Sequence, residues 1–424
     1  MIASVAPILI AIGAFFLRII NLDIPKGFVF DEVYYVDGAR DLLKYGVEVD
    51  GLKPEFVVHP PIGKWSIAIG IKIFGDNEFG WRITAAIAGT LIILIASRLA
   101  HELFYSPFLT AITAALLTFD GLLLVHSRTA LLDLFLTLFI LIAAYFWFRQ
   151  QYWYASIFFG LALATKWSAL YVIALFGFVT LFRLYQQESV KESLRTVTLR
   201  IVQFGVIPIS IYITSWIGWF ISERGWNRDY ASNPFSSLIY YHKQMLDFHT
   251  SLVEKHAYQA NPWSWLIMGR PTSFYYESPQ GCGSNNCAQE VLALGTPVLW
   301  WSATIAVVVL IGYWMWQFYQ RQVDSKLTFI LLGIIAGYLP WFFFQKRTVF
   351  SFYAIVFEPF LILALVYCAK LFIDRSRNPA DAQVIILGFV AVVFLNFVYF
   401  LPLYLGEVIT YAQWHMRMWF PSWI

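Results

Sequence analysis

The sequence predicts an all-α membrane protein that crosses the bilayer many times. Of its 424 residues, 59% are hydrophobic and only 13% are charged, against about 25% charged residues in an average soluble domain. The hydrophobic residues form long blocks, many of about 18 or more, which is typical of spanning helices. A soluble chain of this size has too little interior to bury so much apolar surface. The net charge of +3 is too small to indicate nucleic-acid binding.

Hydropathy divides the chain into about eleven spans. The predicted spans are residues 3–20, 81–101, 107–125, 128–148, 153–166, 167–185, 201–220, 297–319, 327–345, 350–373 and 383–405. Residues 62–75 are apolar but short, which favours a helix that lies in the membrane interface. Residues 153–185 form either one long helix or two helices that are split at Thr165 and Lys166.

The distribution of Lys and Arg sets the orientation, because cytoplasmic loops carry an excess of both. With the N-terminus inside, the inner connections hold Arg98, Arg149, Arg183, Lys191, Arg195, Arg200, Arg321, Lys326, Lys370, Arg375 and Arg377. A single span over 153–185 places the basic segment 183–200 outside, so two spans are favoured. The first span lacks a basic n-region and is not expected to be a cleaved signal peptide.

Two outer loops, at about 21–80 and about 221–296, are expected to hold most of the mass outside the membrane. The second is rich in aromatic residues, and long loops of this kind are usually functional rather than disordered. It contains Cys282 and Cys287, which we expect to form a disulfide on the oxidising side of the membrane. A metal site is the alternative, disfavoured because no second cysteine pair accompanies them. Cys368 falls in a span and is expected to be a buried small hydrophobe.

Asp31 and Glu32 are adjacent carboxylates that directly follow the apolar patch GFVF in the first outer loop. In the functional interpretation, one is a general base and the other tunes or positions it. In the structural interpretation, both are acids in the first turn of a helix over FDEVYYVDGARDLLKYG. The two interpretations are compatible, because a helix N-terminus also keeps a carboxylate ionised.

His59 and Lys64 flank a rigid turn, since two prolines follow His59 and proline fixes the backbone. Either residue could face a lipid phosphate at the membrane surface. The favoured interpretation from this segment alone is a loop corner followed by a snorkelling lysine.

Four further ionisable residues lie at the outer ends of predicted spans: Arg82, Arg128, Asp133 and Lys166. Such groups are costly at the edge of a membrane and are therefore candidate substrate-binding residues. The alternative is that Arg128 and Asp133 only pair with each other.

Lys346 and Arg347 lie on the outer side, against the general charge rule, and suit an anionic lipid phosphate. Their alternative role is ordinary snorkelling. Together with the carboxylates, these cations indicate a transferase whose donor is a lipid-linked phosphosugar. A transporter of an anionic amphiphile needs the cations but not the base, and would be expected to contain internal repeats, which the sequence lacks.

Several successive segments carry a family resemblance, in order along nearly the whole chain. These are FDEVYYVDGARDLLKYG, HPPIGKW, GWRITAAIAGT, LTFDGLLLVHSRTALLDLF, LALATKWSALY, NPWSWLIMGRPTSFYYES, LALGTPVLWW and RTVFSFYAIVFEPF. The chain resembles the protein O-mannosyltransferase family, and its ending resembles actinobacterial members. The resemblance implies the GT-C glycosyltransferase fold and a bacterial plasma membrane enzyme.

The resemblance also implies roles. Asp31 is expected to be the general base on an acceptor Ser or Thr hydroxyl, Glu32 to support substrate binding, and Arg82 to support the acidic site. Arg347 is expected to bind the donor phosphate. The residues His59, Lys64, Arg128, Asp133 and Lys166 match family motifs whose roles are less specific.

The reaction implied by the resemblance is an inverting transfer of mannose from polyprenyl-phosphate-mannose, without a metal. The acceptor would be an unfolded or secreted Ser/Thr-rich polypeptide, with the secretion machinery as a further candidate partner. A lipid or glycan acceptor remains the alternative. Eukaryotic members carry a β-trefoil domain in the long loop, and residues 221–296 are too few to hold one. The longer cytoplasmic tail expected before the first span in bacterial relatives is missing or short.

Overall fold

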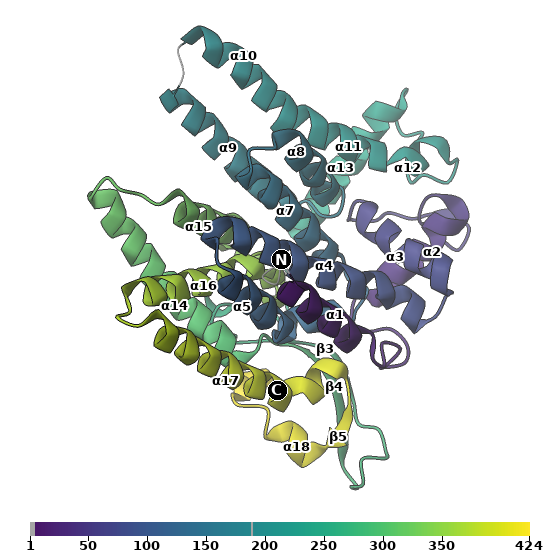
Figure 1. Ribbon diagram of the computed structural model, residues 1–424. Coiled ribbons are helices and arrows are strands. Elements are labelled where there is room, and N and C mark those ends of the chain that lie inside the picture. Colours follow the sequence, from purple (N-terminus) through teal and green to yellow (C-terminus); the bar gives the residue numbers. More distant parts are fainter. Residues whose placement is uncertain (1–4, 188–189) are drawn as a thin grey trace.

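The computed structural model describes residues 5–187 and 190–424 and is mostly helical (Figure 1). In the first half of the chain the α-helices are α1 (Val5–Ile19), α2 (Glu32–Tyr45), α3 (Ile62–Phe74), α4 (Glu78–Phe104), α5 (Pro107–Thr118), α6 (Gly121–His126), α7 (Leu132–Phe148), α8 (Tyr152–Leu163), α9 (Ala169–Gln187) and α10 (Val190–Ile201). In the second half they are α11 (Ile207–Ser215), α12 (Ile217–Ile221), α13 (Pro234–Ser251), α14 (Pro297–Tyr319), α15 (Ser325–Tyr338), α16 (Glu358–Arg375), α17 (Pro379–Leu405) and α18 (Tyr411–His415).

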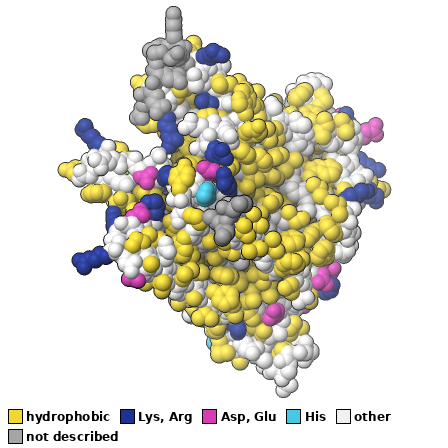
Figure 2. All heavy atoms as spheres, in the orientation of Figure 1, with side chains coloured by type: hydrophobic (Ala, Val, Ile, Leu, Met, Phe, Trp, Pro, Cys, Tyr) yellow, Lys and Arg dark blue, Asp and Glu magenta, His cyan; other side chains and the backbone are white. Residues whose placement is uncertain are grey.

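Five helical segments in the described chain are long and apolar enough to cross a membrane. They are Glu78–Phe104, Leu194–Ser215, Pro297–Tyr319, Ser325–Phe344 and Pro379–Leu405. Shorter apolar helices, α1, α5, α7, α8 and most of α9, coincide with other predicted spans. Hydrophobic side chains cover much of the face shown in Figure 2, and the charged ones form small groups on it. This surface is that of a protein surrounded by lipid.

Two predicted spans are interrupted. The span predicted at 107–125 breaks after Thr118, because the Asp120 carboxylate accepts hydrogen bonds from the backbone N–H groups of Leu122 and Leu123 and begins α6 there. The span predicted at 201–220 contains a π-helical turn, η2 (Val202–Val206), and ends its regular helix at Ser215.

The break between α8 and α9 agrees with the two-span interpretation of residues 153–185. α8 ends at Leu163, and the carbonyl of Ala164 accepts a hydrogen bond of 3.0 Å from the N–H of Ile62, the first residue of α3. The start of α3 is therefore fixed against the same break that contains Lys166. α3 itself buries Ile67 and Ala68 and exposes Ile69 and Ile73, the pattern of a helix lying in an interface.

The prediction of an entirely helical protein is wrong in one respect. A short hairpin pairs β1 (Val49–Asp50) with β2 (Lys53–Pro54), and an antiparallel sheet has the order β3 (Thr272–Glu277), β4 (Cys287–Ala293), β5 (Val408–Thr410). The sheet joins the long outer loop to the end of the chain, and the pairing of β4 with β5 brings together residues more than a hundred positions apart.

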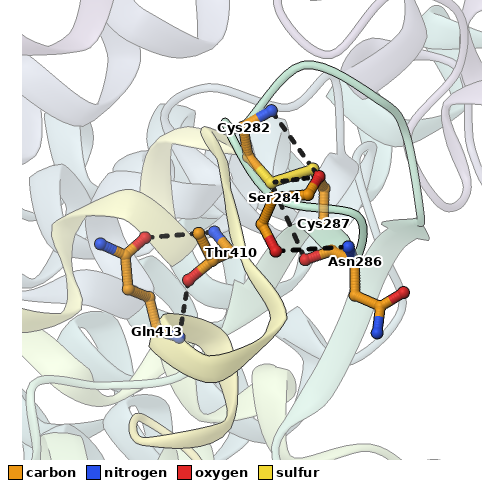
Figure 3. Close-up of a disulfide and its surroundings, with 6 residues drawn as sticks. All are labelled: Cys282, Ser284, Asn286, Cys287, Thr410 and Gln413. Carbon is orange, nitrogen blue, oxygen red and sulfur yellow. Dashed lines mark hydrogen bonds between the residues drawn. A yellow bond between two sulfur atoms is a disulfide. The ribbon is translucent and has the colours of Figure 1, made fainter.

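The predicted disulfide is present, and it joins Cys282 to Cys287, the first residue of β4 (Figure 3). Cys287 is paired with Thr410 of β5, and the N–H of Tyr411 donates to the carbonyl of Asn286 at 3.0 Å. The Thr410 hydroxyl and the Gln413 side chain cap α18 reciprocally. The bridge therefore closes the turn at the point where the end of the chain meets β4.

Candidate active site

Asp31 stands at the N-cap of α2, yet its side chain makes no capping hydrogen bond. The polar contact of its carboxylate is with the Tyr35 hydroxyl, which donates to Oδ2 at 3.3 Å. The structural interpretation is confirmed for the backbone, because α2 begins at Glu32 with Asp31 at its N-cap. The Asp31 side chain, however, does not accept the backbone N–H that an N-cap acid normally accepts. The half-buried Asp31 carboxylate keeps acceptor capacity for another ligand.

Glu32 is fully buried and is bound on every side. Its carboxylate accepts two hydrogen bonds of 2.8 Å from Nε and Nη2 of Arg82, and one each of 2.8 Å from the N–H groups of Val29 and Ala130. Arg82 is equally buried and also donates to the carbonyls of Leu22, Pro25 and Gly27.

The role that the resemblance implies for Arg82, support of the acidic site, agrees with this ion pair. Direct contact of Glu32 or Arg82 with a substrate does not agree with the structure. Both side chains are inaccessible to solvent, and they form their hydrogen bonds with each other and with the backbone. They hold the first loop against α4 and the segment before α7. Since Glu32 follows Asp31 directly, this ion pair fixes the backbone that carries Asp31.

The alternative pairing of Arg128 with Asp133 is wrong. Arg128 donates to the carbonyls of Arg18, Ile20 and Asn21 at the end of α1. Asp133 instead accepts from the Lys166 ammonium at 2.8 and 3.0 Å. Arg128 thus connects the segment before α7 to the end of α1. The Asp133–Lys166 pair instead lies beside Asp31. The Lys166 Nζ atom is 4.4 Å from the centre of the Tyr353 ring.

Asp31 is tuned by this pair. Burial raises the pKa of Asp31 to about 6, the nearby Lys166 ammonium opposes that rise, and Asp133 adds to it. A carboxylate with such a pKa is ionised at neutral pH and accepts a proton more readily than an ordinary Asp. The position of Asp31 and its electrostatics both suit a general base.

His59 and Lys64 separate in the structure. Lys64 is buried and forms an ion pair with Glu48, so it does not face a lipid phosphate. His59 packs its ring 6.1 Å from that of Tyr35 and 5.4 Å from that of His249. Burial lowers the pKa of His59 well below its usual value, helped by the Lys166 charge. The His59 imidazole is therefore neutral and packs between Tyr35 and His249 rather than acting as a cation.

Arg347 lies on the other side of His249. Its Nη2 is 3.2 Å from His249 Nδ1, and its Nε is buried without a hydrogen-bond partner. His249 Nε2 faces the carbonyl of Val58 at 2.9 Å, so Nε2 carries the proton and Nδ1 accepts from Arg347. Burial and the Arg347 charge lower the pKa of His249 to about 4. Sequence reasoning missed His249, because a lone histidine in a long loop carries no motif.

Lys346 is exposed, in contrast to Arg347. Its placement agrees with the snorkelling interpretation of that residue. Arg347 therefore lies at the candidate site and Lys346 lies outside it, just as Asp31 lies at the site and Glu32 does not.

An apolar groove with a volume of about 490 Å³ lies between α9 and the end of α15. Its walls include Tyr171 and Phe178 from α9, and Ile335, Phe343 and Phe344 from α15 and the following 3₁₀ turn η4 (Leu339–Phe344). Arg347 lies close enough to Tyr171 to act on its hydroxyl electrostatically. Tyr171 therefore lies between the wall of this groove and the surroundings of the Arg347 guanidinium.

Within the described residues, no group of three or more His, Cys, Asp or Glu side chains is arranged to hold a metal ion. The groups assembled here are a carboxylate, an ion pair, neutral imidazoles and a guanidinium. They can accept a proton and bind an anion.

Comparison with known proteins gives matches along nearly the whole chain. Residues 8–217 match the family model described as dolichyl-phosphate-mannose-protein mannosyltransferase. Residues 234–423 match the model of the C-terminal four-transmembrane region of protein O-mannosyltransferase.

Among curated proteins, the chain is 32% identical over 469 aligned residues to polyprenol-phosphate-mannose–protein mannosyltransferase of Mycolicibacterium smegmatis, covering 96% of this chain and 90% of that protein. It is 30% identical to the protein of the same name from Mycobacterium tuberculosis, with coverage of 93% and 86%.

Solved structures share the fold. The Saccharomyces cerevisiae protein O-mannosyltransferase Pmt1–Pmt2 complex bound to the sugar donor matches with a TM-score of 0.85 at 15% identity, over 100% of this chain and 93% of that chain. ArnT from Cupriavidus metallidurans bound to undecaprenyl phosphate matches with a TM-score of 0.57 at 16% identity, over 94% and 75%. The GT-C fold expected from the sequence is therefore present. With relatives at this identity aligned over nearly its full length, the chain belongs to the protein O-mannosyltransferase family.

Proposed function

We propose that this protein transfers mannose from polyprenyl-phosphate-mannose to Ser or Thr hydroxyls of secreted or membrane polypeptides. Its relatives in mycobacteria bear the name of this activity. The observation that carries the proposal is the Asp31 carboxylate, held at a helix start without a capping bond and with a pKa raised to about 6 by burial. A transporter needs no such base.

Asp31 is the general base of the proposed reaction. Its carboxylate takes the proton of the acceptor hydroxyl as the hydroxyl oxygen attacks the anomeric carbon of mannose. The bond between that carbon and the phosphate oxygen breaks at the same time, and polyprenyl phosphate leaves with the electron pair. One displacement of this kind inverts the configuration at the anomeric carbon.

Arg347 binds the phosphate of the donor. Its Nε is unpartnered, and His249 holds Nη2 in place, so the remaining donor atoms are free for an oxyanion. The apolar groove beside Tyr171 accommodates the first isoprene units of the lipid tail. The Asp133–Lys166 pair completes the site: Lys166 keeps Asp31 ionised, and its positive charge offsets the charge that develops on the leaving phosphate.

The proposal includes an orientation. We place the N-terminus in the cytoplasm and both long loops outside, because the basic connections then lie inside. About eleven spans follow if the shorter apolar helices also cross the bilayer. The reaction then takes place at the outer face of the membrane, where a secreted polypeptide emerges.

The test is transfer of radiolabelled mannose from polyprenyl-phosphate-mannose to a Ser/Thr-rich peptide, with wild type and Asp31→Asn at matched amounts. Loss of a general base lowers the rate by about 100- to 10,000-fold. Because the pKa of Asp31 is raised to about 6, the folded protein is more stable with this carboxyl protonated, and that stability is lost as the pH rises through about 6. Asparagine is uncharged at every pH. Asp31→Asn should therefore be at least as stable as wild type at pH 7.5. Transfer at near wild-type rate by the variant removes Asp31 from this role. If folded wild type transfers mannose to a lipid or glycan but not to the peptide, the acceptor in this proposal is wrong.

A further inference from the structure

A second apolar groove lies along the middle of α9, next to the groove beside Tyr171. It has a volume of about 360 Å³ and runs between α9 and the α10–η2 segment. Its apolar walls include Gly177, Phe178, Leu181, Ile201 and Phe204. Arg183, just beyond this groove, is separated from Tyr171 by twelve residues, or about 18 Å along the helix. The groove therefore extends from the middle of α9 toward the end of the helix that carries Arg183.

Two arginines stand at the mouth of this groove. Arg200 lines it, and its guanidinium carbon is 4.1 Å from the centre of the Tyr152 ring. Arg183 lies on Trp147, with a distance of 5.0 Å between the guanidinium carbon and the ring centre. Both guanidinium groups are near enough to the Tyr152 hydroxyl to act on it electrostatically.

Neither arginine is neutralised by a carboxylate in the part of the chain that the structure describes. The polar partner of Arg200 is the neutral Gln203 side chain, at 2.6 Å. A guanidinium that packs against an aromatic ring can still donate its N–H groups, and the planar fork of these donors matches the geometry of a phosphate group. Two such forks above an apolar groove complement one kind of molecule, an anionic amphiphile.

We propose that this groove binds an anionic phospholipid, with an acyl chain between α9 and η2 and the phosphate at Arg183 and Arg200. Under the proposed orientation the lipid comes from the cytoplasmic leaflet, where anionic head groups attract basic residues. The groove shares Ala174 and Phe178 with the groove beside Tyr171. An acyl chain on one side of α9 therefore packs against the wall of the site assigned to the donor tail.

The experiment uses the full-length protein purified in detergent. Native mass spectrometry measures retention of phosphatidylglycerol against phosphatidylcholine with identical acyl chains. Wild type should prefer phosphatidylglycerol by about tenfold, equivalent to about 1.4 kcal/mol, and the double variant Arg183→Gln with Arg200→Gln should prefer it by less than about twofold. Arg321→Gln, which removes an exposed arginine of the α14–α15 connection, is the matched control and should behave as wild type.

Three outcomes would overturn the assignment. The double variant keeps the preference, the control loses it equally, or excess polyprenyl phosphate displaces the phosphatidylglycerol, which would make both grooves one donor site. If the double variant elutes as an aggregate, the alternative experiment is photo-crosslinking of wild type. It uses a phosphatidylglycerol that carries a reactive acyl chain. Crosslinks must then fall on α9 and η2. This experiment measures lipid binding and does not depend on mannose transfer. A failure of the proposed activity can therefore be told apart from a failure of lipid binding.

Discussion

Replacing Glu32 by Gln should unfold the protein more readily rather than alter its chemistry. The wild-type carboxylate receives four hydrogen bonds of 2.8 Å, two of them from Arg82, and both side chains are fully buried. Glutamine offers one acceptor oxygen, and its NH₂ group points a donor at other donors. Removing one partner of a buried ion pair costs about 3–5 kcal/mol.

The lower end of that range applies here. Arg82 keeps its hydrogen bonds to the carbonyls of Leu22, Pro25 and Gly27 after the substitution, so we expect a loss of about 3 kcal/mol. In a chain of this size that corresponds to a fall in Tm of roughly 3 °C. Thermal unfolding in detergent, followed by tryptophan fluorescence, measures it.

Asp31→Asn is the matched comparison for Glu32→Gln, since it changes the adjacent carboxylate to the same amide. Its Tm should not fall, while its transfer rate should. The reasoning is refuted if Glu32→Gln unfolds at the wild-type temperature and yet transfers no mannose, because Glu32 would then act in the chemistry. A double variant that replaces Glu32 by Leu and Arg82 by Met should regain part of the lost stability, since no uncompensated charge remains.

Three further predictions concern the groups around the base. The transfer rate should fall about tenfold per pH unit below pH 6, because protonated Asp31 accepts no proton; a pH profile that is flat down to pH 5 would contradict this. Arg347→Lys should raise the KM for the donor more than it lowers kcat, and His249→Ala should do the same more weakly, since the histidine only orients the guanidinium; equal effects on kcat alone would exclude phosphate binding. Lys166→Met leaves Asp133 without its partner and should move the pH profile upward, because a positive charge that favours ionised Asp31 is gone; an unshifted profile would place Lys166 outside the site.

The sequence predicted the positions of the helices well, but it predicted poorly which distant residues contact one another. Long apolar blocks such as 297–319 and 383–405 became α14 and α17 within a few residues, because hydropathy alone determines them. The break at Asp120 was missed because it depends on one side chain that caps a helix inside an apolar block. The sheet was missed because β5 is three residues long and finds β4 only in the folded chain.

The candidate site shows the same division. Adjacency could not tell Asp31 from Glu32, because the partners that bury Glu32 come from positions 82 and 130. Arg128 and Asp133 are close in sequence, but they point to different neighbours, the end of α1 and Lys166. Pairings between distant residues need the fold, and the family resemblance supplied candidate residues without their contacts.

The hydrogen bond from Ala130 to Glu32 also constrains the order in which the site is assembled during synthesis. Glu32 enters the membrane environment early, but one of its donors follows it by 98 residues, after α4, α5 and α6. The first outer loop therefore cannot reach its final conformation until α6 and the start of α7 have been inserted. Until then Arg82 is its one charged partner. We infer that Asp31 acquires its working position as a late step of membrane insertion, so a nascent chain shorter than about 130 residues exposes its acids without a functional base.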